Sequence, residues 1–279
     1  MDRAPAYRGP VELPRPLELR PRLSHVVFDF DGTLSWLRHG WPEIMCAVME
    51  ERLPRLAGED DAARRTLLSG IIHGLNGRPT ILQMMRFAEV VRARGGEAFD
   101  PEQLRGIYQE RLDQRIAERI ASIRAQRRPR DDYVVFGARP LLEKLKREGL
   151  TLAVLSSTVE ERVRQEAEVL GLSGYFAGGI LGCVGDAQAF SKRAVFERML
   201  REQSLKGEQL LSFGDGPVEI LDTKQLGGTA IAVCSDEDVN GSGVINQVKR
   251  EALLAAGADV VLPDFRDAAA VVDRLRGRA

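Results

Sequence analysis

The feature that most constrains the fold of this chain is the alternation of short apolar runs with amphipathic helices after Pro129. The apolar runs are continuous instead of carrying a polar residue at every second position, which is typical of parallel strands buried on both faces. Helices between such strands cover the sheet, so the pattern predicts an α/β fold built on a parallel sheet. The strands expected in this part lie at residues 150–155, 179–181, 210–213, 229–233 and 260–262.

One more strand is expected well before the others, at residues 26–30, where a β-branched and aromatic run ends in an Asp-Gly turn. The stretch that follows it is predicted to be helical, because apolar residues such as Leu104, Tyr108 and Leu112 recur at helical spacing. The order of elements therefore indicates a helical segment inserted between two parts of one sheet.

The chain is predicted to have three parts. Residues 1–24 hold five of the 13 prolines, which predicts an extended tail that lies on the surface or is partly mobile. Residues 25–35 and 137–279 are expected to form the α/β core. Residues 36–136 are expected to form the inserted helical domain.

The composition excludes several classes of protein. Forty basic and 41 acidic residues leave a formal net charge of −1, so no global field would attract nucleic acid or an anionic membrane. The apolar runs are too short to span a membrane, and no secretory signal is evident. Three widely spaced cysteines indicate buried thiols in a reducing compartment. We expect a cytoplasmic protein with no nucleic-acid or membrane partner.

Acidic, basic and hydroxyl side chains gather where the predicted strands end or the next helix begins. The first strand ends in Asp29 and Asp31, which share a side because residues two apart in a strand do so. Parallel sheets bind ligands at the carboxyl ends of their strands, so groups that follow other strands should meet these two carboxylates. These further groups are Ser156, Ser157, Lys192, Asp215 and Glu219.

Backbone donors are expected beside these side chains. Gly32 and Thr33 form a turn whose N–H groups can hold an anion, and Ser156 and Ser157 precede a predicted helix N-terminus. Crowded carboxylates repel one another unless a hard cation neutralises them, and oxygen ligands without imidazoles suit Mg²⁺. A Mg²⁺ ion, a lysine and backbone donors around an aspartate form a site for a phosphoryl group.

Four strings, in chain order, resemble the motifs of the haloacid dehalogenase (HAD) superfamily. They are FDFDGTL at residues 28–34, LAVLSS at 152–157, Lys192, and FGDGPVEI at 213–220. The resemblance covers the predicted core from about residue 25 to 35 and from 137 to 265. It implies an HAD-like α/β core with a Rossmann-like parallel sheet, and a helical cap at residues 36–136.

The resemblance also implies roles for four side chains. Asp29 would be the nucleophile that accepts the phosphoryl group, forming an aspartyl-phosphate. Asp31 would protonate the leaving oxygen and then activate the water that hydrolyses the intermediate. Ser156 would hydrogen-bond a phosphoryl oxygen, and Lys192 would balance the charge between Asp29 and the phosphate.

A Mg²⁺ site is implied in the same way, formed by Asp29, Asp215 and the backbone carbonyl of Asp31. Glu219 falls where the family usually has an aspartate. Its extra methylene leaves open whether it contacts the metal directly or through a water molecule.

These residues predict a phosphoric monoester hydrolase: a Mg²⁺-dependent phosphatase that acts on a small phosphorylated metabolite. Asp31 favours phosphoryl transfer, because members that displace halide resemble D-x-Y instead of D-x-D at this place. A phosphomutase that returns the phosphoryl group to a second hydroxyl of a sugar would use the same motifs. A third interpretation is a non-catalytic interaction protein with the same fold. The argument against it is that the catalytic residue types are all present, at Asp29, Asp31, Lys192 and Asp215.

Substrate contacts outside these motifs are expected in two places. Arg38 and His39 follow the first motif, where the family has a flap that reaches the substrate; plain surface exposure is the alternative. Arg78 lies in a polar loop with a glycine, at residues 76–80, between two predicted helices.

Overall fold

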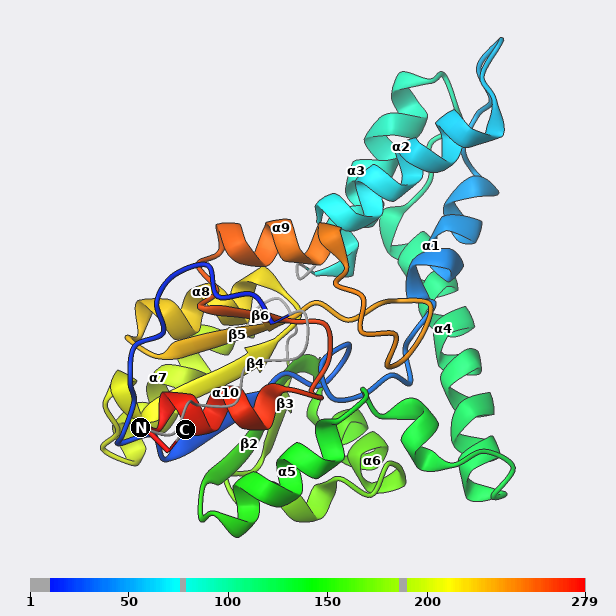
Figure 1. Ribbon diagram of the computed structural model, residues 1–279. Helices are drawn as coiled ribbons and strands as arrows, with labels where there is room; N and C mark the ends of the chain where they lie inside the picture. The colour runs from blue at the N-terminus through cyan, green and yellow to red at the C-terminus, as the bar shows by residue number, and fades with distance from the viewer. Residues whose placement is uncertain (1–10, 76–78, 186–189, 279) are drawn as a thin grey trace. The chain divides into compact units, whose positions relative to one another are not determined.

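The computed structural model describes residues 11–75, 79–185 and 190–278. Six strands within these residues form one parallel sheet in the order β3-β2-β1-β4-β5-β6 (Figure 1). They are β1 (His25–Phe28), β2 (Thr151–Val159), β3 (Ile180–Cys183), β4 (Leu210–Gly214), β5 (Thr229–Val233) and β6 (Val260–Leu262). The predicted α/β fold with a parallel sheet is confirmed.

Helices cover both faces of this sheet. One face carries α5 against α10, and α7, α8 and α9 pack side by side on the other (Figure 1). The α-helices of this part are α5 (Ala138–Arg147), α6 (Glu160–Val169), α7 (Lys192–Glu202), α8 (Pro217–Gln225), α9 (Gln247–Ala255) and α10 (Ala268–Leu275). Short 3₁₀ helices span Arg130–Tyr133 (η1), Ser173–Tyr175 (η2) and Gly207–Gln209 (η3).

Aromatic side chains fill the core directly behind the ends of the central strands. Phe28 stacks on Phe213 of the neighbouring strand with ring centroids 5.0 Å apart, and Phe265 packs against both rings. All three side chains are fully buried. Because Asp29 directly follows Phe28, this rigid aromatic cluster fixes the point at which the chain leaves the sheet.

Two strands differ in length from the prediction. β1 ends at Phe28 instead of residue 30, although the N–H of Asp29 still donates to the carbonyl of Phe213 at 2.9 Å. β2 continues to Val159 instead of ending at residue 155. Its pairing with β3 shifts in register between Leu155 and Val159, so this part of the strand is irregular. The sequence predicts a turn before a helix at these residues.

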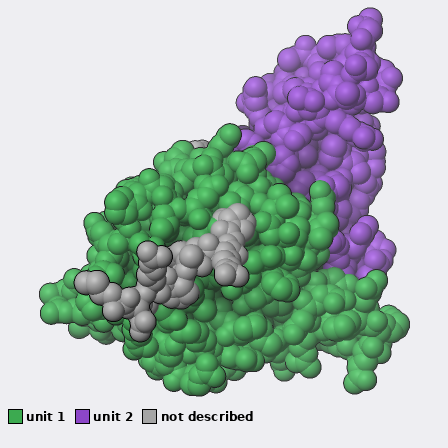
Figure 2. Space-filling view, viewed as in Figure 1, with its two compact units in different colours: residues 1–37, 122–279 green, residues 38–121 purple. Residues whose placement is uncertain are grey.

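The chain divides into two compact units (Figure 2). The first comprises residues 1–37 and 122–279 and holds the sheet. The second comprises residues 38–121 and is helical within its described residues. Its elements are α1 (Trp41–Glu50), α2 (Asp61–Gly74), α3 (Thr80–Ala93) and most of α4 (Pro101–Arg124).

The helical unit has a hydrophobic core of its own. Met49, Leu68, Ile72 and Phe87 are at most 1% exposed and belong to one cluster. Tyr108, Leu112 and Ile116 present the face of α4 that joins this cluster, at the spacing expected of an amphipathic helix.

The boundaries of the helical unit differ from the predicted range of 36–136. Residues 122–136 belong to the sheet-bearing unit, because backbone hydrogen bonds attach them there. The N–H of Trp36 donates to the carbonyl of Tyr133 at 2.8 Å, and that of Val135 to the carbonyl of Leu34 at 3.0 Å. The two connecting segments therefore pair with each other within the sheet-bearing unit.

The described part of the N-terminal tail, residues 11–24, packs against the sheet-bearing unit and begins beside β6. Glu12 and Val261 exchange two backbone hydrogen bonds of 3.0 Å in an antiparallel bridge. Arg250 donates to the Glu12 carboxylate at 2.6 Å, which ties this segment to α9. No helix within the described residues is long and apolar enough to span a membrane.

Candidate active site

The two acidic residues after β1 point to different partners. The chain turns sharply after the strand, because the N–H groups of Leu34 and Ser35 both donate to the carbonyl of Phe30. Asp29 interacts with Lys192, whereas Asp31 interacts with residues of β2. Asp31 lies in this turn, beyond the end of β1, so the two carboxylates have different partners, which allows them different chemical roles.

Asp31 is held by two hydroxyl groups of the irregular end of β2. Thr158 Oγ1 donates to Asp31 Oδ2 at 2.7 Å, and Ser156 Oγ lies 3.5 Å from the same oxygen. The N–H of Thr158 donates to Ser156 Oγ at 3.1 Å, which links the two hydroxyls. Ser156 is buried and Ser157 is exposed. Ser156 thus contacts the predicted acid, and Thr158 is a site residue that lies outside the sequence motifs.

Lys192 connects two of the acidic residues. It is the first residue of α7, whose start is capped by the Ser191 side chain. Its Nζ lies 2.9 Å from Asp29 Oδ1 and 3.2 Å from Glu219 Oε2, and its side chain is only 6% exposed. Burial disfavours the ammonium, but the attraction of Asp29 and Glu219 outweighs it and raises the pKa of Lys192 above its usual range. Lys192 is therefore a fixed cation next to Asp29.

Glu219 is positioned by the start of α8. Its Oε1 accepts a hydrogen bond of 2.7 Å from the N–H of Gly216, closing the helix N-terminus, while Oε2 faces Lys192. Gly214 makes this possible, because a Cβ there would lie 2.3 Å from Cγ of Glu219. Both oxygens of Glu219 thus have partners within the protein.

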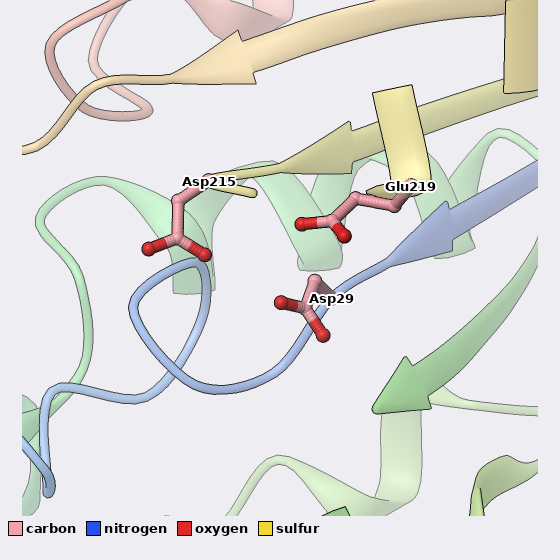
Figure 3. A group of neighbouring side chains, drawn as sticks. All are labelled: Asp29, Asp215 and Glu219. Carbon is pink, nitrogen blue, oxygen red and sulfur yellow. The ribbon is translucent and has the colours of Figure 1, made fainter. Parts of the chain in front are cut away.

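Asp29, Asp215 and Glu219 form an acidic cluster at the ends of β1 and β4 (Figure 3). Each offers one carboxylate oxygen, and these oxygens lie within 4.8 Å of one another. Burial, together with the negative charges of Glu219 and Asp215, raises the pKa of Asp29 well above its usual value although Lys192 opposes this. Two ammoniums, Lys192 and Lys249, do not balance these three carboxylates and Glu237, so the cluster has the negative charge and the hard oxygen donors that fit Mg²⁺.

The turn at Gly32 and Thr33 supports Asp215, and it already uses the N–H of Gly32. The N–H of Gly32 donates to the carbonyl of Ser35 at 3.0 Å, so the expectation that it holds an anion is wrong for this conformation. Thr33 is fully buried, and its Oγ1 donates to Asp215 Oδ1 at 3.2 Å. The turn closes on itself because Leu34 and Ser35 both return to Phe30.

A second buried lysine, which no sequence signal indicates, reaches the cluster from α9. Lys249 Nζ lies 3.0 Å from Asp215 Oδ2 and 3.4 Å from Ser235 Oγ, and it also pairs with Glu237. Attraction by Asp215 and Glu237 outweighs burial and raises the pKa of Lys249 above its usual range. No motif surrounds Lys249 in the sequence. It reaches the site because the loop between β5 and α9 places the start of α9 there.

The predicted substrate contacts outside the motifs belong to the helical unit or are not described. Arg38 and His39 are the first residues of the helical unit. Arg119 donates to the carbonyl of His39 at 2.9 Å and to its Nδ1 at 3.0 Å, since a guanidinium only donates. Burial and the charges of Arg119 and Arg115 lower the pKa of His39 to about 4, so this ring is neutral at pH 7. Arg78 lies outside the described residues.

We expect Gly32→Ala to destabilise the protein more than Gly149→Ala. Both glycines have a left-handed backbone, with φ of +77° and +79°, so each substitution carries a strain of roughly 1–2 kcal/mol. A Cβ at Gly32 would also lie 2.2 Å from Asp215 Oδ2, whereas nothing lies within 4 Å of a Cβ at Gly149. Urea unfolding of both variants measures the difference, and equal losses of unfolding free energy would contradict the close approach of Asp215.

Comparisons with known proteins agree with this architecture. A search among curated proteins gave no match. A solved structure predicted to be a phosphoglycolate phosphatase, from Haemophilus somnus 129PT, is 16% identical with a TM-score of 0.60, and the match covers 90% of this chain and 98% of that one. A structure provisionally assigned as a β-phosphoglucomutase, from Thermotoga maritima, is 20% identical with a TM-score of 0.57, covering 90% and 99%.

A third structure, an HAD family hydrolase from Deinococcus radiodurans R1 with bound phosphate and sodium, is 16% identical with a TM-score of 0.59, covering 91% and 97%. At these identities the likenesses show a shared fold. The family model for haloacid dehalogenase-like hydrolases matches residues 23–227, which is well over half of the chain. The chain therefore belongs to the haloacid dehalogenase-like hydrolases.

Proposed function

We propose that this chain is a Mg²⁺-dependent phosphatase that hydrolyses a small phosphate monoester through a phosphorylated Asp29. The observation that carries the proposal is the buried contact of 2.9 Å between Lys192 Nζ and Asp29 Oδ1 beside the acidic cluster. A carboxylate fixed by an ammonium at the end of a central strand is suited to attack phosphorus, because the same ammonium can contact the phosphoryl oxygens.

In the first step, Asp29 attacks phosphorus, and the bond from phosphorus to the ester oxygen of the substrate breaks. Asp31 gives its proton to the departing oxygen, which leaves as an alcohol. Thr158 and Ser156 hold the Asp31 carboxylate, whereas Lys192 holds that of Asp29, so the acid and the nucleophile have different partners. Lys192 remains charged and attracts the phosphoryl oxygens as they approach Asp29.

In the second step, a water molecule attacks the phosphorylated Asp29. Asp31, now ionised, takes a proton from this water, the bond between Asp29 and phosphorus breaks, and inorganic phosphate leaves. Both aspartates are then as they were at the start. The reaction therefore balances with water as the only co-substrate.

Asp29, Asp215 and the backbone carbonyl of Asp31 would hold the Mg²⁺ ion. When bound, it would reduce the repulsion between these carboxylates and the phosphate and would polarise a phosphoryl oxygen. Glu219 already accepts hydrogen bonds from Gly216 and Lys192. We therefore propose that it acts on the metal through water and mainly orients Lys192.

The free state of all three cysteines supports a further part of this proposal, that the protein works in the cytoplasm. The neighbour assigned as a phosphomutase shares this fold, and such an enzyme would use the same aspartates. Phosphate release distinguishes these two activities.

We expect the purified chain to release phosphate from at least one member of a panel of phosphorylated sugars, nucleotides and small acids when Mg²⁺ is present. Chelation should abolish this release and added Mg²⁺ should restore it, because Asp29 otherwise faces two carboxylates and a dianionic phosphate. Full activity after exhaustive chelation would contradict the metal requirement. Isomerisation primed by a sugar bisphosphate, without net phosphate release, would indicate a phosphomutase.

The two aspartates should respond differently to substitution by asparagine. Asp29→Asn should abolish turnover of every substrate, because the attacking oxygen is lost. Asp31→Asn should slow the first step with a sugar phosphate by about 10²- to 10⁴-fold, and slow an aryl phosphate less, since an aryl oxide leaves without protonation. Single-turnover kinetics with both substrates measures this.

Asp238→Asn, an exposed position of the same unit, is the matched control and should keep full activity. Equal slowing of the sugar and aryl phosphates by Asp31→Asn would remove the general acid role from Asp31.

A further inference from the structure

Lys249 is a second buried cation next to the proposed metal site. It occupies the third position of α9, where its N–H donates to the Asn246 side chain that caps the helix. Its side chain is 6% exposed and contacts Asp215, Ser235 and Glu237. An ammonium on a helix of the outer layer thus reaches across to a carboxylate at the end of β4.

The carboxylate of Asp215 is constrained on both oxygens. Thr33 Oγ1 donates to Oδ1 at 3.2 Å, and Lys249 Nζ lies 3.0 Å from Oδ2. Gly32 packs against the same group so closely that a Cβ would lie 2.2 Å from Oδ2. Each carboxylate oxygen has a second lone pair, so Asp215 can accept both bonds and still offer an oxygen to a cation.

We propose that Lys249 is a positioning residue that fixes Asp215 in the orientation in which it binds the divalent cation. This inference rests on the metal site of the proposed function. Hydrogen-bonding partners of metal ligands orient those ligands, and their loss typically costs 10- to 100-fold in metal affinity. Thr33 alone would leave Oδ2 free to rotate away from the cluster.

The positive charge of Lys249 would by itself repel a divalent cation, so its net effect depends on what balances it. Glu237 pairs with the same ammonium, and its side chain is 21% exposed. The Lys249–Glu237 pair therefore presents almost no net charge to the cluster. The orienting hydrogen bond to Asp215 then makes the net effect of Lys249 on cation binding favourable. Ser235 adds to the constraint, because it contacts Lys249 and donates to the carbonyl of Gly32 at 3.3 Å.

The test is the affinity for Mg²⁺ alone, measured by isothermal titration calorimetry without substrate. Lys249→Met should raise Kd for Mg²⁺ by about 10- to 100-fold. Lys249→Arg keeps the charge and the donors and should restore most of the affinity. A Kd for Lys249→Met equal to or below that of the wild type would overturn the inference.

Lys224→Met is the matched control. Lys224 also bonds an aspartate, with Nζ 2.8 Å from both oxygens of Asp259, but at the opposite, amino end of the strands. This variant should unfold at a lower temperature and bind Mg²⁺ with wild-type affinity. An equal loss of affinity in both lysine variants would mean that general destabilisation is responsible, and would also overturn the inference.

Two further outcomes separate this inference from the proposed function. Wild-type protein that binds no Mg²⁺ would overturn the metal site and the inference with it. If the wild-type protein binds Mg²⁺ but no more tightly than Lys249→Met does, only the role of Lys249 is overturned. Circular dichroism checks folding, and if Lys249→Met does not fold, Lys249→Gln replaces it, with an expected affinity below that of Lys249→Arg.

Discussion

The contact between Lys192 and the carboxylates of Asp29 and Glu219 is the interaction on which the rest of the site depends. Parallel strands bring Asp29 and Asp215 to one edge of the sheet, where burial makes their mutual repulsion strong. Lys192 offsets this repulsion from α7 and Lys249 does so from α9. Two helices on the same face of the sheet thus each supply one buried ammonium to the carboxyl ends of the strands.

This electrostatic arrangement separates two functions within a short turn. Asp29 lies in the strongly charged environment of the cluster, whereas Asp31 lies between the hydroxyls of Ser156 and Thr158. A nucleophile needs to be ionised, whereas burial and the charges of Glu219 and Asp215 raise the pKa of Asp29; Lys192 opposes this rise, and a bound Mg²⁺ would oppose it further. The aromatic stack behind the strand ends supports the backbone at Asp29, and the turn that closes on Phe30 holds that at Asp31.

The sequence predicted the sheet and the residues of the acidic cluster because both follow from local pattern. Continuous apolar strands indicated a parallel sheet, and the parallel sheet placed Asp29, Lys192, Asp215 and Glu219 at one edge. Thr158 was missed because β2 continues as an irregular strand past the predicted end, although a residue two positions beyond Ser156 is expected on its face. Lys249 carries no local signal, since only the path of the β5–α9 loop brings it to Asp215.

The wrong expectation for Gly32 has the same origin as the missed residues. A glycine after an aspartate indicates a turn but not the acceptor of its N–H, which is the carbonyl of Ser35. The boundaries of the helical unit likewise depend on pairing between residues 34–36 and 133–135, which lie far apart in the sequence. Contacts made across long sequence distances are what the pattern of a single chain does not specify.

Detection of the phosphorylated aspartate itself tests the proposed mechanism most directly. Wild-type protein would be mixed with Mg²⁺ and a substrate found in the phosphate-release screen, quenched with acid within milliseconds and digested with pepsin at low pH, where an acyl phosphate survives. We expect a phosphoryl group on the peptide that contains both Asp29 and Asp31, with fragment ions that place it on Asp29. A phosphoryl group on any other residue, or steady turnover with no phosphorylated peptide at any quench time, would contradict this mechanism.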